Sequence, residues 1–600
     1  MKSHRSKKQL SGLLAIVTAL ALLAGCQAPT PPPPDPEPTA PAVRPTATKP
    51  AAGEGYYCVS ADNVTLPVKA ETGSHSVLNQ LILAGTASAI EEVMAKATDR
   101  FGEFTLLQTC YLNRVLAEPP KAERQGDERP IRGWSDRDEF TTDQRQNLVT
   151  QLYQTPDGSP FREIIPFVNE VGNELSVYAD PNYLTGPLQQ EANPISPCAV
   201  RQEPFEIGGS PFEIGGSPFE IGGSSSGGHG AMADPDIFWK QWAFRDIALE
   251  RTERDNWGEG VTVAIFDTSP YSEAQPSPVT IRDDNVDLEL HLTFPEMVNV
   301  LSPTWLQAPT DTLTTTLPIT VADHGLFAAG LVEAVAPEST IHLVRVLNDY
   351  GCGDLWTLND AINSFVDQHT KGDRQSNRLV LNLSLGVLQP RDFDKAQWPA
   401  EIVTLEQALL NAHGRGAVIV AASGNESYAT EDPPRPMAIP AGWPIVIGVA
   451  ASNQAGGFAC YSNDGYVLAP GADGREATEE ACQPRADECK FDNAGCPVGI
   501  VSLASEHNER DRPAYRFWVG TSFAAPLVSG QAAALLSNGI AAADVKPCIL
   551  NTATPGDGGS IVNVPGSIAA CSSATSQRTG SWPADRTDER RSELQIRVHP

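Results

Sequence analysis

The stretch Gly520-Thr521-Ser522-Phe523-Ala524-Ala525-Pro526 opens an apolar segment of small residues and decides how the second half of the chain is interpreted. Pro526 is compatible with a helix only in its first turn or so, and the pattern predicts a helix that begins close to Ser522. At a helix N-terminus, free backbone N–H groups and the helix dipole stabilise negative charge. Ser522 is therefore either a simple helix cap or a nucleophile placed where an oxyanion would be stabilised.

Upstream of this stretch, short apolar runs alternate with helical patterns. The runs are 261–266, 341–346, 379–385, 417–422 and 445–450. This rhythm predicts βαβ units, and hence an α/β fold with a parallel sheet covered by helices on both faces. In such sheets the functional side chains lie just beyond the carboxyl ends of the strands.

Three further polar residues lie at such positions. Asp267 ends the apolar run that begins at Val261, and Asn425 follows the run 418–422 through Ser-Gly. His324 stands between Asp323 and Gly325 at the start of a small-residue helical segment. An Asp can orient a His, and an Asn amide can donate to a developing oxyanion. Each residue alone is compatible with an ordinary structural role.

Taken together, the order Asp267, His324, Asn425, Ser522 resembles that of the subtilisin-like serine proteases, the subtilases. The resemblance covers residues 234 to about 545. It implies a three-layer fold with a parallel sheet between helices, and the catalytic triad Asp267, His324 and Ser522. Asn425 and the Ser522 backbone N–H would form the oxyanion hole. The implied substrate-binding residues are Ser384, Leu385, Gly386, Ala421, Ala422, Ser423 and Gly424.

The neighbours of the triad depart from the family pattern. The family usually has Gly two residues after the catalytic Asp, where this chain has Ser269, and Met after the nucleophile, where it has Phe523. An unusual insertion, 472–497, carries three cysteines and is interpreted as a disulfide-stapled surface loop. The chemistry requires no cofactor and the residues indicate no metal site. The sequence leaves a structural calcium ion open.

The N-terminus indicates export. A basic start and the apolar run 13–23 precede Leu23-Ala24-Gly25-Cys26, which resembles the lipobox of bacterial lipoproteins. The resemblance implies a signal peptide over 1–25 and acylation of Cys26. The alternative is an ordinary signal peptide with an accidental cysteine. We expect an extracytoplasmic protein that is lipid-anchored to a bacterial membrane, either the outer membrane facing the periplasm or the cell surface, with a proline-rich tether over 26–55.

Charge and cysteine usage agree with that compartment. The formal net charge of −31 argues against nucleic-acid binding, which needs a basic surface. The chain has 11 cysteines, so an even number remains once Cys26 is acylated. None of the spacings is typical of zinc ligands, and disulfides in an oxidising compartment are the better explanation.

Between the tether and the catalytic domain, 56–200 is expected to form a smaller α+β domain. Its segment 177–183 resembles the last strand of subtilase propeptides. Residues 201–233 contain three copies of Pro-Phe-Glu-Ile-Gly-Gly-Ser and form a flexible linker. We predict autocleavage between about Ser196 and Pro235, with 56–200 inhibiting the enzyme as a propeptide; the alternative is a permanent accessory domain. The catalytic domain is expected over 234–564 and a loose polar tail over 565–600.

The sequence thus predicts a serine endopeptidase that hydrolyses extended polypeptides through an acyl-enzyme. A rival is a catalytically weak or inactive peptide-binding lipoprotein on the same fold, against which the intact triad argues. A narrow-specificity processing or ligating peptidase is a second rival. Substrate preference, disulfide connectivity, Gram type and oligomeric state stay open.

Overall fold

The computed structural model describes two parts of the chain. These are residues 56–186 and 232–577, without 61–75, 112–147, 157–160, 253, 296–320, 350, 370–377, 388–401, 426, 428–433, 474, 479–480, 484–488 and 508–512. All of them belong to one compact unit, Lys49–Pro600. The signal peptide, the tether, Cys26 and the predicted linker up to residue 231 lie outside the described residues.

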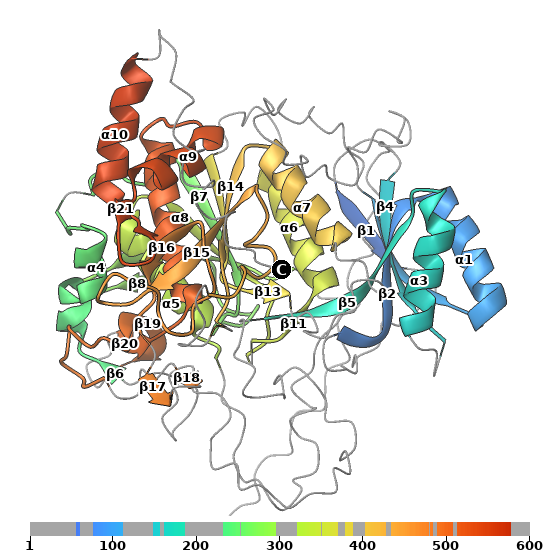
Figure 1. Cartoon of the computed structure of the whole chain (residues 1–600), viewed down its shortest axis with the longest axis horizontal. Helices are drawn as coiled ribbons and strands as arrows, with labels where there is room; N and C mark the ends of the chain where they lie inside the picture. Colours follow the sequence, from blue (N-terminus) through green and yellow to red (C-terminus); the bar gives the residue numbers. More distant parts are fainter. Residues whose placement is uncertain are drawn as a thin grey trace, which may run out of the picture. The chain divides into compact units, whose positions relative to one another are not determined.

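A ten-stranded sheet organises the larger part of the chain (Figure 1). In spatial order its strands are β21 (Thr554–Pro555), β22 (Ser560–Ile561), β16 (Val467–Pro470), β15 (Val446–Ser452), β14 (Ala417–Ala422), β12 (Arg378–Leu383), β7 (Val261–Asp267), β10 (Thr340–Arg345), β9 (Asp287–Thr293) and β8 (Val279–Arg282). Every pair from β22 to β9 is parallel, and the outer pairs β21–β22 and β8–β9 are antiparallel. The predicted parallel sheet is confirmed.

Strand β7 shows why helices cover both faces of this sheet. All seven of its residues are buried, and alternate residues point to opposite faces. Val263 and Ile265 pack in one core with α5 (His324–Val335) and α8 (Thr521–Ser537). Ala264 and Phe266 pack in the other with α6 (Leu355–His369) and α7 (Val403–Gly414). This three-layer arrangement is the predicted one.

The C-terminal boundary differs from the sequence-based prediction. The loose tail was expected from residue 565, but α10 (Val564–Gln577) is helical and packs against α8 and α9 (Ala542–Thr552). A disulfide between Cys548 and Cys571 ties α10 to α9. The small residues of α10 give a weak periodic signal, and its burial comes from tertiary packing that the local sequence does not reveal.

Smaller elements complete this larger part of the chain. They are β6 (Met232–Ala233), η2 (Pro235–Lys240), α4 (Trp242–Asp246), the hairpin β17 (Arg475–Thr478) and β18 (Ala481–Gln483), and the strands β19 (Ile500–His507) and β20 (Pro513–Trp518). β6, which lies just before the predicted domain start at residue 234, pairs with β20. In the predicted insertion, Cys489 bonds to Cys496, and Cys352 and Cys460 elsewhere are also disulfide-bonded.

The described part of 56–186 is the expected smaller α+β domain (Figure 1). Its antiparallel sheet has the order β1 (Tyr57–Ser60), β3 (Thr105–Tyr111), β4 (Leu148–Gln154), β2 (Ser76–Thr86) and β5 (Tyr178–Gly186). Helices α1 (Ala87–Phe101) and α3 (Phe161–Asn173) form a core with one face of the sheet. β5 also pairs with β11 (Gly353–Asp354) and β13 (Gly386–Val387) of the larger part of the chain.

Membrane attachment is not visible in these elements. None of the helices in the described ranges is both long enough and apolar enough to cross a bilayer.

Candidate active site

Asp267 and His324 form a buried pair at the carboxyl end of β7. His324 is the first residue of α5, and its Nδ1 lies 2.8 and 3.0 Å from the two carboxylate oxygens of Asp267. The side chains of Asp267 and His324 are 0% and 1% exposed. The Thr268 backbone N–H donates to Asp267 Oδ1 at 2.6 Å, and Thr268 Oγ1 accepts from the Gly325 N–H at 3.2 Å. Thr268 thus joins β7 to α5.

Aromatic side chains surround the His324 ring. The ring of Phe523 lies 4.9 Å from it, and that of Trp518 packs edge-on at 5.6 Å, both between centroids. Phe327 in turn contacts Phe523 and Trp518. These three rings exclude water from one side of the imidazole and restrict its orientation.

Ser522 is the second residue of α8, as the sequence predicts. The residue before the helix, Gly520, has a φ of +148°, a conformation that favours glycine. Ser522 Oγ donates to the Ser384 carbonyl oxygen at 3.1 Å, and Ser384 Oγ donates to the Ser522 carbonyl oxygen at 2.7 Å. Among the described contacts Ser522 Oγ is hydrogen-bonded to Ser384, and no hydrogen bond joins it to His324.

Asn425 lies beside Ser522 with its carboxamide held in place. Its Oδ1 accepts from both the backbone N–H and the hydroxyl of Thr521, each at 2.9 Å. A Cβ built on Gly520 would lie 3.6 Å from Asn425 Nδ2, which puts the NH₂ group at the head of α8. A carboxamide whose oxygen is used in this way presents its N–H groups to an oxyanion near Ser522.

The predicted substrate-binding residues have three different surroundings in the structure. Ser384 contacts Ser522, and Gly386 pairs with Gly186 of β5. Leu385, Ala421 and Ala422 are at most 2% exposed and belong to the two cores, so their side chains hold the strands rather than line a surface. Ser423 and Gly424 follow β14, where the Gly424 N–H donates to Thr521 Oγ1 at 3.2 Å.

Strand β5 lies between two short strands next to Ser384. Thr185 is opposite Gly353 on one side and Val387 on the other, and all of these pairings are antiparallel. A Cβ on Gly353 would lie 2.4 Å from the Val346 carbonyl oxygen and 2.8 Å from Thr185 Oγ1, so only glycine permits this close approach. β5 is therefore held as an extended strand whose last residue, Gly186, pairs with Gly386, two residues after Ser384.

The comparison with protein families decides the identity of the catalytic part. The family model described as "Subtilase family" matches residues 258–567. The chain belongs to the subtilase family. This subtilase is 29% identical over 249 residues to the "Thermophilic serine proteinase" of Bacillus sp. (strain AK1), covering 39% of this chain and 48% of that protein. It is 27% identical over 241 residues to "Thermitase" of Thermoactinomyces vulgaris, covering 38% and 67%.

The subtilase described here spans about half the length of the Bacillus sp. (strain AK1) protein. Among solved structures, a protease from Pseudoalteromonas arctica PAMC 21717 is similar. It shares 21% sequence identity at a TM-score of 0.38, over 57% of this chain and 99% of that one.

Some residues near the site of this subtilase carry no signal in the sequence. Ser529 Oγ donates to Asn382 Oδ1, and Asn382 Nδ2 donates to Ser384 Oγ, both at 2.9 Å, so a buried polar chain positions Ser384. The strand β11 was also missed. Gly351-Cys352-Gly353 directly before a helical pattern was the one available signal, since Gly-X-Gly marks a close backbone approach.

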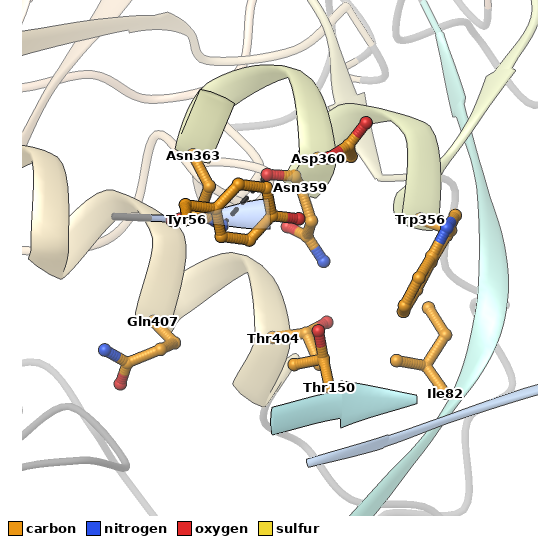
Figure 2. A pocket seen from close by; sticks show the side chains of 9 residues that line it. All are labelled: Tyr56, Ile82, Thr150, Trp356, Asn359, Asp360, Asn363, Thr404 and Gln407. Carbon is orange, nitrogen blue, oxygen red and sulfur yellow. Dashed lines mark hydrogen bonds between the residues drawn. The ribbon is translucent and has the colours of Figure 1, made fainter. Parts of the chain in front are cut away.

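The contact of α6 and α7 with the N-terminal sheet encloses a small polar cavity (Figure 2). It is lined by Tyr56, Ile82, Thr150, Trp356, Asn359, Asp360, Asn363, Thr404 and Gln407. Asn359 is 7% exposed, yet neither polar atom of its carboxamide has a hydrogen-bond partner within the described structure. Interfaces between domains of one chain are in general more polar than obligate protein–protein interfaces.

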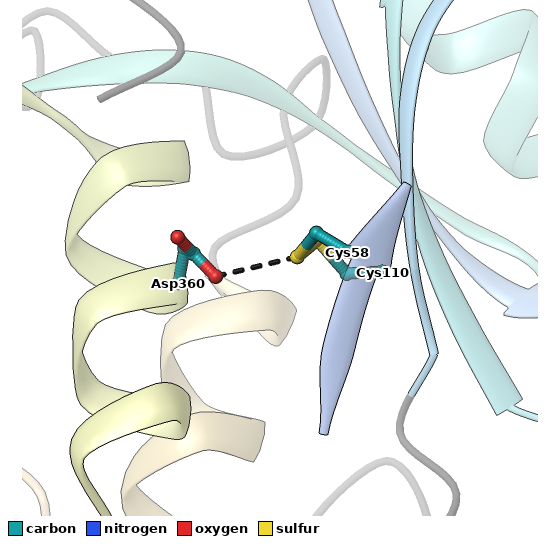
Figure 3. Close-up of side chains that lie close together, drawn as sticks. All are labelled: Cys58, Cys110 and Asp360. Carbon is teal, nitrogen blue, oxygen red and sulfur yellow. Dashed lines mark hydrogen bonds between the residues drawn. A yellow bond between two sulfur atoms is a disulfide. The ribbon is translucent and has the colours of Figure 1, made fainter. Parts of the chain in front are cut away.

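Among the described residues, one cluster of His, Cys, Asp or Glu side chains could be considered for a metal ion, and its chemistry does not suit calcium. The cluster consists of Cys58, Cys110 and Asp360 (Figure 3). Cys58 and Cys110 form a disulfide across β1 and β3, and Cys58 Sγ lies 3.3 Å from Asp360 Oδ1. Calcium needs six to eight oxygen ligands, which a disulfide and one carboxylate do not supply.

Proposed function

We propose that this subtilase is a serine endopeptidase that hydrolyses peptide bonds in extended polypeptides outside the cytoplasm. The observation that carries the proposal is the buried Asp267–His324 pair next to Ser522 at the head of α8. A serine hydroxyl becomes an effective nucleophile only when a neighbouring base takes its proton. The intact triad argues against the rival of an inactive peptide-binding lipoprotein.

In the proposed reaction, Ser522 Oγ leaves the Ser384 carbonyl, gives its proton to His324 and attacks the substrate carbonyl carbon. Asp267 holds the imidazole through Nδ1 and stabilises the imidazolium. The negative charge that develops on the carbonyl oxygen is stabilised by the Asn425 NH₂ and the Ser522 backbone N–H.

The tetrahedral intermediate collapses when His324 donates its proton to the leaving amine, which leaves an acyl ester on Ser522. Water then attacks the ester while His324 takes its proton. As the bond between the acyl carbon and Ser522 Oγ breaks, His324 returns the proton to Ser522 Oγ, which releases the carboxylic acid product and regenerates the free serine. β11 and β13 would hold the substrate backbone as an added strand, as they hold β5 here.

We further propose that residues 56–200 act as a propeptide that blocks the cleft until the chain is cut. The pairing of β5 with β11 and β13 supports this, because a strand in that position excludes substrate. The proposed cut between about Ser196 and Pro235 lies outside the described residues. The position of Gly186 opposite Gly386 favours a cut closer to β5, and N-terminal sequencing of the active enzyme discriminates between the two.

The lipid anchor at Cys26 remains part of the proposal, and it would hold the protein on a bacterial membrane. A cut after β5 would separate the anchor from the catalytic domain. The protease would then stay at the membrane only while the two parts remain bound through β5 and the α6 and α7 contact.

The decisive experiment is labelling with a serine-directed fluorophosphonate, followed by peptide mapping. The wild-type chain should be labelled on Ser522, and Ser522→Ala should abolish both labelling and peptide hydrolysis. Ser88→Ala is the matched control, because Ser88 is an exposed residue of α1 and should not affect labelling. Labelling that persists in Ser522→Ala would place the nucleophile elsewhere.

A further inference from the structure

The side chain of Asn182 in the N-terminal domain forms hydrogen bonds to the catalytic domain through both ends of its carboxamide. Asn182 of β5 is fully buried, and its Nδ2 donates to Asp354 Oδ1 at 3.1 Å. The backbone N–H of Trp356 donates to Asn182 Oδ1 at 3.0 Å. The same Nδ2 donates to Gln80 Oε1 of β2 at 2.9 Å. The catalytic domain therefore presents one acceptor and one donor to a single carboxamide.

The catalytic half of this contact is held in place by its own helix. Asp354 directly precedes α6, and its Oδ1 accepts from the Thr357 backbone N–H at 3.1 Å while Oδ2 accepts from the Thr357 hydroxyl at 2.8 Å. These bonds fix the carboxylate as the cap of α6 whether or not Asn182 is bound. The Trp356 N–H belongs to the first turn of α6, where an intrahelical acceptor is missing, so it needs an external one.

We propose that Asp354 and the Trp356 N–H form an extended subsite for an asparagine side chain. In β5, Thr185 lies opposite Gly353, and Asn182 precedes Thr185 by three residues. Through this subsite the enzyme would select polypeptides that carry Asn three residues before the residue that pairs with Gly353. The inference rests on the proposed function. Its ligand class is a polypeptide strand in the cleft, either the chain's own β5 or a substrate.

The chemistry of the subsite discriminates against close analogues of Asn. An Asp in place of Asn182 would put two carboxylates at the 3.1 Å separation that the amide now has from Asp354, and like charges at that distance in a buried site repel strongly. An Ala would leave the Asp354 acceptor and the Trp356 donor without this partner. A Gln carries the same amide on a longer stem, so it would have to displace β5 from its register with β11.

The first test measures how peptides with the β5 sequence, Tyr178–Gly186, inhibit hydrolysis of a short fluorogenic peptide. Four versions carry Asn, Gln, Ala or Asp at the position of Asn182. The enzyme is the full-length chain with Asn182→Asp, whose own β5 should bind weakly beside β11. Any remaining competition from that β5 affects all four peptides equally. We expect the inhibition constant to rise about 10-fold for Ala and about 100-fold for Asp relative to Asn.

The same series is repeated with Asp354→Asn added. An amide at that position can donate to an Asp ligand, so the Asn-over-Asp preference should fall at least 10-fold. Asp349→Asn is the matched control, because Asp349 lies in the turn that precedes β11, is half-exposed and pairs with Arg345. The control should keep the preference. Equal inhibition by the Asn and Asp peptides, or an unchanged preference in Asp354→Asn, would overturn the subsite.

A second measurement needs no catalysis and uses the full chain with Ser522→Ala. Asn182→Asp should lower its melting temperature, and adding Asp354→Asn should recover part of the loss. Absence of this recovery argues against the contact even if the wild-type chain hydrolyses peptides. Recovery, combined with a wild-type chain that hydrolyses no peptide, would instead refute the proposed function and restrict the subsite to binding β5.

Discussion

Replacement of Gly325 by Ala should disable the catalytic pair through a single methyl group. Gly325 is the second residue of α5, directly after His324. A Cβ at this position would lie 2.3 Å from the Thr268 carbonyl oxygen, 2.7 Å from Leu343 Cδ1 and 3.0 Å from Asp267 Cβ. The nearest of these contacts is backbone at the end of β7, which cannot rotate away, so the first turn of α5 must move.

The size of the movement follows from ordinary contact distances. A Cβ needs about 3.4 Å from such an atom, so α5 would shift by about 1 Å, given that dispersion contacts are optimal at about 3.5–4.0 Å. A shift of that size in the same direction would stretch the 2.8 Å Asp267–His324 hydrogen bond to about 3.8 Å, beyond its useful range. Alanine gains about 1 kcal/mol in helix propensity, while overpacking costs about 1–3 kcal/mol.

We therefore expect Gly325→Ala to lower kcat about 100-fold, since a misplacement of about 1 Å can have that effect, and to lower stability by about 1 kcal/mol. The assays are hydrolysis of a fluorogenic peptide, the rate of fluorophosphonate labelling, and thermal denaturation. Gly414→Ala is the matched control, because a Cβ there meets nothing within 4 Å. Wild-type kcat in Gly325→Ala would refute the argument that α5 is held against β7 at this glycine.

Three further outcomes are expected. Asn425→Ala should lower kcat by about 10² to 10³, the range known for removal of one oxyanion donor in subtilisin, with little change in KM; equal kcat values would exclude Asn425 as a donor. Burial raises the pKa of Glu333 from 4.5 to about 7, although the nearby Arg254 opposes the shift. The Glu333 carboxyl group therefore loses its proton at a lower pH in the unfolded chain than in the folded one. As the pH rises from 4.5 to about 7, the free energy of unfolding should fall by about 3 kcal/mol, and above that range Glu333 should change it no further. Glu333→Gln should remove that slope in denaturant titrations, and a slope that stays would assign it to other groups. Cys26→Ala should release the protein from the membrane fraction, and persistent membrane association would indicate another anchor.

The sequence by itself determined where the candidate catalytic residues lie relative to strands and helices. Asp267 and Asn425 follow buried strands, and Ser522 follows a glycine at the start of a helix, so local patterns alone place them at one edge of a parallel sheet. The order of these residues and His324 then indicated the family. Such positions are readable because strand and helix ends are encoded by short-range periodicity and by glycine and proline.

Only the tertiary structure decided the contacts between distant segments. The placement of β5 between β11 and β13, the hydrogen bond from Asn182 to Asp354, and the hydrogen bond from Ser522 to Ser384 join residues far apart in the sequence. The helical state of α10 likewise depends on packing against α8 and α9 and not on its own weak pattern. Backbone pairing and side-chain hydrogen bonds across such separations depend on how the whole chain packs, and no local periodicity specifies them.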